Sequence, residues 1–83
     1  MMLDPLSAGP NALTIGLDGL RALLRESAAR PGAPLSLAVA PRVARALDAR
    51  PTALAEAGRA MGRPVVLIER GDIELFAIEE LAR

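Results

Sequence analysis

The first clear pattern in the chain is that of an amphipathic helix between residues 11 and 29. Apolar side chains recur there at spacings of three and four residues, which places on one helix face Leu13, Leu17, Leu20, Leu24 and Ala28. Asn11 or Thr14 can cap the start of this helix. Gly16 and Gly19 each cost about 1 kcal/mol against alanine inside a helix. They therefore indicate a close approach to a neighbouring helix or sheet.

Three later segments have the patterns of β-strands. After a Pro-Gly-Ala-Pro turn at 31–34, residues 35–40 alternate between large and small side chains, which predicts a first strand with one strongly apolar face. The β-branched runs 65–68 and 73–78 flank the dipeptide Gly71-Asp72. Such a dipeptide is typical of hairpin turns, because glycine takes a positive φ at no steric cost. The two runs therefore predict an antiparallel hairpin.

Two short helices are predicted between the first and second strands. Pro41 suits the first position of a helix, whose inward side chains are Val43, Ala46 and Leu47. Pro51 cannot continue that helix, so the chain should break at 48–50 and resume as a helix over 52–61. The side chains of this helix that face inward are Leu54, Ala57 and Met61, and Gly62 is its C-cap. One kinked helix remains the alternative to two.

The elements together predict one small α+β domain over 11–83. Their order is helix, strand, helix, helix, strand, strand, with residues 1–10 as an irregular lead-in and 79–83 as a short helical or frayed tail. The first two strands should be parallel if they are neighbours, because a helical crossover joins them. We therefore expect a mixed three-stranded sheet with helices mainly on one face.

Composition narrows the functional classes. The 83 residues carry ten arginines against ten acids, and this formal charge of zero argues against a protein that mainly neutralises nucleic-acid phosphates. A core with a single aromatic residue, Phe76, packs thinly, so we expect a protein partner or a homo-oligomer to supply further burial. No apolar run approaches the length of a membrane span and the start lacks signal-peptide features, so a cytoplasmic location without membrane contact is expected.

Candidate chemistry is sparse. The chain has no cysteine and no histidine, which removes thiolate metal sites and the commonest general base. The serines then have no base to activate them, and the acidic pairs Asp72/Glu74 and Glu79/Glu80 are more typical of a solvated surface than of a metal site. We expect no catalytic, cofactor-binding or metal-binding residue, and no enzyme activity of the chain on its own.

Arginines gather in the helix-helix segment and its exit. They offer at most a weak RNA-backbone or partner contact, through Arg42, Arg45, Arg59 and Arg63. No aromatic side chain accompanies them to stack on bases, so a solvated arginine surface is the simpler interpretation.

Several short strings occur in a recognisable order. They are Leu20-Arg21-Ala22-Leu23-Leu24-Arg25-Glu26, Val39-Ala40-Pro41-Arg42-Val43-Ala44, Met61-Gly62-Arg63-Pro64-Val65 and Phe76-Ala77-Ile78. Their order and spacing resemble the C-terminal small domain of the ribonuclease E/G family, bacterial endoribonucleases that process and degrade RNA. The resemblance covers about residues 9–78. It implies an accessory domain that supports oligomerisation or buttresses a nuclease.

The chain also departs from that family. The family's zinc-link cysteines are absent, and its magnesium-binding aspartates belong to an upstream domain that this chain does not contain. No catalytic residue can therefore be carried over. The leading hypothesis is a non-catalytic accessory domain in oligomerisation or RNA-processing assembly, and the alternative is an independent protein-binding or regulatory module of an antitoxin-like kind.

Overall fold

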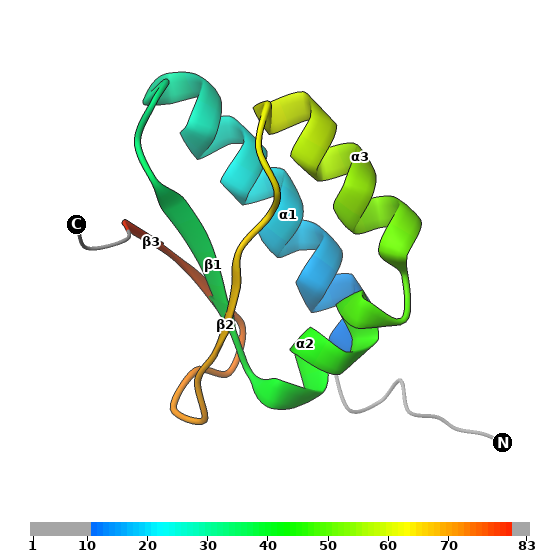
Figure 1. The fold of residues 1–83 in the computed structure, drawn as a ribbon. Helices are drawn as coiled ribbons and strands as arrows, with labels where there is room; N and C mark the ends of the chain where they lie inside the picture. The colour runs from blue at the N-terminus through cyan, green and yellow to red at the C-terminus, as the bar shows by residue number, and fades with distance from the viewer. Residues whose placement is uncertain (1–10, 81–83) are drawn as a thin grey trace, which may run out of the picture.

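The structure is a computed structural model that describes residues 11–80. Its elements are α1 (Ala12–Ala29), β1 (Leu35–Val39), α2 (Pro41–Asp48), α3 (Pro51–Met61), β2 (Leu67–Glu69) and β3 (Phe76–Glu80). This order confirms the predicted α+β class with a mixed three-stranded sheet, and Figure 1 shows the helices together on one face of it. The predicted lead-in at 1–10 and the last three residues of the predicted tail lie outside the described residues.

β1 is the central strand of the sheet, whose order is β2-β1-β3. β1 and β2 are parallel, with Leu37 level with Leu67, as predicted for strands joined by a helical crossover. β3 runs antiparallel to β1, and Ile78 lies opposite Leu37 on that side. The predicted hairpin between the second and third strands is therefore wrong, because these strands occupy opposite edges of the sheet (Figure 1).

The length of the strands explains this pairing. β2 has three residues, whereas β1 offers five positions, which pair one for one with Phe76–Glu80. Pairing on both sides of β1 satisfies the backbone of a strand whose five residues are all buried. Gly71 accordingly does not make the predicted positive-φ turn, since among the glycines of residues 11–80 only Gly32 and Gly62 have positive φ.

The bounds of the two edge strands also differ from the sequence patterns. The patterns predicted strands at 65–68 and 73–78, and the structure has them at 67–69 and 76–80. Glu80 pairs with Leu35 at the start of β1, so β3 extends as far as its neighbour does. The prediction of a helical or frayed tail is therefore wrong for Glu79 and Glu80.

The helix ends follow the predicted signals. The Asn11 side chain accepts a hydrogen bond of 2.8 Å from the backbone N–H of Thr14 and caps α1. α2 ends at Asp48 and α3 begins at Pro51, which confirms two separate helices. Gly62 takes φ 80° and is the C-cap of α3, as expected.

The buried face of α1 is rotated from the predicted leucine stripe. The buried residues of α1 are Ile15, Gly16, Gly19, Leu20 and Leu23. Of the predicted stripe only Leu20 is buried, whereas Leu13, Leu17 and Leu24 are half-buried and Ala28 is exposed. The reason is the close approach at both glycines. A Cβ on Gly16 would lie 2.7 Å from Leu47 of α2, and one on Gly19 would lie 3.1 Å from Leu37 of β1.

The core lies between the sheet and the helices. Its most deeply buried large side chains come from α1, β1 and α2, namely Leu23, Leu35, Leu37, Val39, Val43 and Leu47. The apolar residues of α3, β2 and β3 are mostly only half-buried against this core. These three elements therefore supply much of the surface on which a binding site can form.

Candidate interaction surfaces

The face of the sheet turned away from the helices is termed the outer face. Its side chains come from Ser36, Ala38, Val66, Ile68, Ala77 and Glu79, which alternate with residues that face the helices. None of these six joins the hydrophobic cluster that contains their neighbours Leu37, Leu67 and Phe76. Ser36 and Ala38 are nevertheless 0% exposed. Side chains from the edge strands must therefore cover this central strip.

An ion pair crosses the outer face. The Arg70 Nη2 atom lies 2.9 Å from Glu79 Oε1, and the two residues come from opposite sides of β1. Arg70 follows Glu69, which is level with Val39, and Glu79 is level with Ser36, so the pair spans the part of β1 that contains Ala38. The aliphatic stem of an arginine can cover apolar surface in this way. Both side chains are partly exposed, so we assign the charge interaction itself no more than about 1 kcal/mol.

Apolar side chains remain accessible beside this ion pair. Val66 is 38% exposed, and Ile68 and Ala77 are half-buried although no helix of the described residues covers them. The outer face is thus an apolar strip with one arginine–glutamate pair across it. The open apolar side chains make this face a candidate interaction surface.

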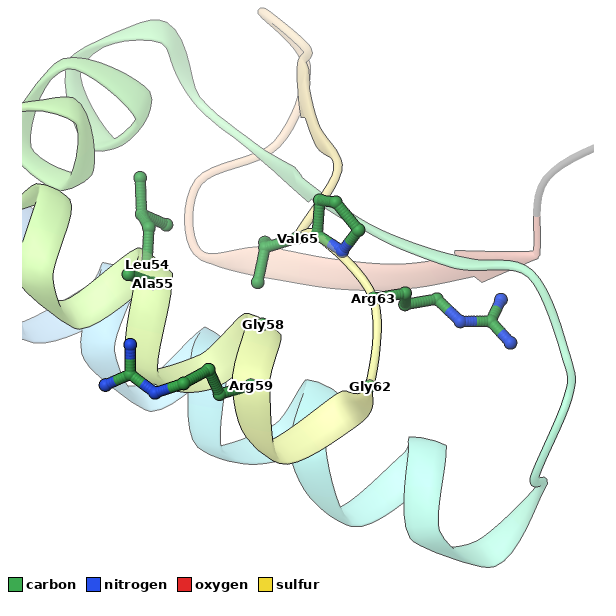
Figure 2. Close-up of a pocket in the computed structure, with 8 residues that line it drawn as sticks. Leu54, Ala55, Gly58, Arg59, Gly62, Arg63 and Val65 are labelled. Atoms are coloured by element: carbon green, nitrogen blue, oxygen red, sulfur yellow. The ribbon is translucent and has the colours of Figure 1, made fainter.

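A second surface is an open groove beside α3, termed the α3 groove and shown in Figure 2. Its volume is about 570 Å³, and it is lined by Leu54, Ala55, Gly58, Arg59, Gly62, Arg63, Pro64 and Val65. Gly58 allows the chain after α3 to lie close to the helix, because a Cβ at this position would lie 3.2 Å from the carbonyl oxygen of Arg63. The chain after α3 can therefore fold back along the helix and form the second wall.

A third surface is a hollow at the end of the sheet where the β2–β3 connection meets α2. Its volume is about 410 Å³, and it is lined by Ile15, Ala40, Arg42, Gly71, Ile73, Glu74 and Leu75. Leu75 is 54% exposed there. Its lining is more polar than that of the α3 groove, and it brings together no chemically distinctive set of side chains.

The four arginines named from the sequence do not form one patch. Arg59 and Arg63 share the α3 groove, while Arg42 lines the hollow beside the β2–β3 connection and Arg45 lines neither. All four are exposed. The structure thus pairs two of them at an apolar groove, and the weak RNA contact assigned to all four stays a prediction.

The acidic residues named from the sequence also do not form one cluster. Glu79 pairs with Arg70. Glu80 pairs with Arg30, the residue that follows α1, and its Oε1 atom lies 3.3 Å from Arg30 Nη1. Asp72 and Glu74 are exposed in the β2–β3 connection. Within residues 11–80 no three histidine, cysteine or carboxylate side chains lie close enough to hold a metal ion. The sequence patterns did not reveal these two ion pairs, because they placed the third strand beside the second.

Comparison of the chain with protein-family models, curated proteins and solved structures gave no match. None of the helices in residues 11–80 has the length and hydropathy required to cross a bilayer.

Proposed function

We propose that this chain is a non-catalytic accessory domain that acts in protein–protein assembly, of the kind that its resemblance to the C-terminal small domain of the ribonuclease E/G family implies. The observation that carries the proposal is the outer face, where Val66, Ile68 and Ala77 leave an apolar strip open beside the Arg70–Glu79 pair. Contact with another protein surface would bury this strip and compensate for a thin core.

The positions of the resembling strings support the same proposal. Val39–Ala44 spans the end of β1 and the start of α2, Met61–Val65 spans the C-cap of α3, and Phe76–Ile78 lies in β3. These three strings therefore fall where the chain turns or pairs, whereas the fourth, Leu20–Glu26, lies within α1. The strings contain no catalytic group, so the role that they support is structural.

Sedimentation velocity tests the proposal with the full chain. The chain is examined alone over a wide range of concentrations, and mixed with the nuclease region of a ribonuclease E/G-type enzyme from the source organism. We expect association in at least one of the two experiments, either of the chain with itself or with the nuclease region. Ile68→Asp on the outer face should weaken this association about tenfold or more. Thr52→Asp, which places the same charge on the exposed start of α3, is the matched control.

Two results would reject this role. One is a chain that remains monomeric and also fails to bind the nuclease region. The other is association that Ile68→Asp and Thr52→Asp affect equally, because the outer face would then not be the contact surface.

A further inference from the structure

We propose that the α3 groove is a second binding surface, which takes a short peptide segment of a partner protein with one apolar side chain flanked on both sides by carboxylates. The groove lies on α3 and the chain that follows it, away from the outer face. The inference therefore does not depend on the assembly role of the outer face, and each can fail without the other.

The walls of the groove define the centre of the occupant. Leu54 is a half-buried residue of α3, and Val65 points toward that helix from the opposite wall (Figure 2). The backbone around α3's C-terminus is already hydrogen-bonded, with the Gly62 N–H donating to Gly58 and Arg59 and the Arg63 N–H donating to Gly58. An apolar side chain between these walls would bury apolar surface without leaving those backbone groups unpaired.

The charges define the ends of the occupant. Arg59 and Arg63 both line the groove and extend in opposite directions in Figure 2, so their guanidinium groups point away from each other. Neither forms an ion pair with any acid of residues 11–80. Arg63 donates one hydrogen bond of 3.3 Å to the carbonyl of Ala33, which is a neutral acceptor and leaves further donors free. Each guanidinium is thus complementary to a carboxylate on either side of the apolar anchor.

The same features favour a peptide over RNA. Phosphate sites commonly use backbone N–H groups at a helix N-terminus, whereas this groove lies at the C-terminal end of α3. Base stacking needs an aromatic side chain, and the only aromatic residue, Phe76, packs against the core from β3. The helix C-terminus also carries partial negative charge, but each arginine carries a full positive charge on a long side chain that projects beyond it.

Fluorescence anisotropy with a defined probe tests the inference. The probe is a labelled peptide in which two aspartates precede and two follow a single leucine, within a glycine–serine frame. The full chain should bind it in a saturable way, and binding should weaken as salt concentration rises. One control peptide replaces the aspartates by asparagine, and the other replaces the leucine by serine. Each should bind at least about tenfold more weakly.

Matched protein variants locate the site. Arg59→Gln and Arg63→Gln should each weaken binding about tenfold, and Val65→Ser should do so by removing an apolar wall. Arg45→Gln is the control, since it removes an arginine of α2 that is also exposed but does not line the groove. Circular dichroism checks that every variant is folded. If Val65→Ser unfolds, the serine-for-leucine peptide still tests the apolar contact.

Three results would overturn the inference. The first is no saturable binding of the acidic peptide, and the second is binding that Arg45→Gln weakens as much as Arg59→Gln does. The third is tight binding of a single-stranded oligoribonucleotide that depends on Arg59 and Arg63 while the peptide fails to compete, which would assign the groove to RNA.

Discussion

Two glycines determine how closely α1 approaches the rest of the domain. Gly16 faces Leu47 of α2, and Gly19 faces both Leu37 of β1 and Phe76 of β3. Glycine weakens a helix by about 1 kcal/mol relative to alanine. The cost is offset here because the missing side chains allow a helix, the central strand and an edge strand to pack directly against the backbone of α1.

Alanine substitutions should separate these two contacts. We expect Gly16→Ala to lower the free energy of unfolding by about 1–3 kcal/mol, because its Cβ would lie 2.7 Å from both Cγ and Cδ2 of the fully buried Leu47. Gly19→Ala should cost less, since its closest contacts are 3.1–3.2 Å and small shifts relieve them. Urea denaturation measures both values, and a larger loss at Gly19 would contradict the packing described.

Backbone conformation distinguishes another pair of glycines. Gly62 has φ 80°, where an L-residue is strained, whereas Gly71 has no positive φ and its added Cβ would meet no atom within 4 Å. Gly62→Ala should therefore lower the free energy of unfolding by about 1–2 kcal/mol, and Gly71→Ala should change it by less than about 0.5 kcal/mol. A clear loss of stability at Gly71 would favour the tight hairpin turn that its sequence suggests.

The elements show which features the sequence encodes locally. Pro41 and Pro51 determine where helices begin and Gly62 where one ends, because each restricts or permits the conformation of its own backbone. The helix bounds were therefore predicted almost to the residue. The partner of β3 was not predictable in this way. Its pairing with β1 is set by strand length and burial across about forty residues of sequence, whereas the Gly71-Asp72 pattern concerns only neighbouring residues.

Adjacent residues of β2 test the assignment of its two faces. Leu67 packs against the core, while Ile68 lies on the outer face beside Ala38. Leu67→Asp should cost about 3 kcal/mol or more, since it places a carboxylate against the apolar core. Ile68→Asp should cost no more than about 1 kcal/mol, because its carboxylate can reach solvent on the outer face. Thermal or urea unfolding compares them, and the reverse order would mean that the register between β1 and β2 is shifted by one residue.

At the scale of the whole molecule, the two candidate surfaces differ in how far the sequence predicts them. Arg59 and Arg63 were singled out as charged residues, yet the groove between them depends on the chain folding back past Gly58, which composition does not reveal. The outer face was less predictable still. It exists because β3 pairs with β1, so that Ala77 and Glu79 come to lie beside Ser36 and Ala38.

The measurement that tests the assembly role most directly is the reactivity of one introduced thiol. The chain has no cysteine, so Val66→Cys on the outer face gives a single site for alkylation, and Thr52→Cys on exposed α3 gives a matched control. Rates are compared between the dilute chain and the chain at high concentration or mixed with a ribonuclease E/G-type nuclease region. We predict that association slows alkylation at position 66 at least about tenfold and leaves position 52 unchanged. Equal rates at position 66 under all these conditions would contradict an assembly role for the outer face.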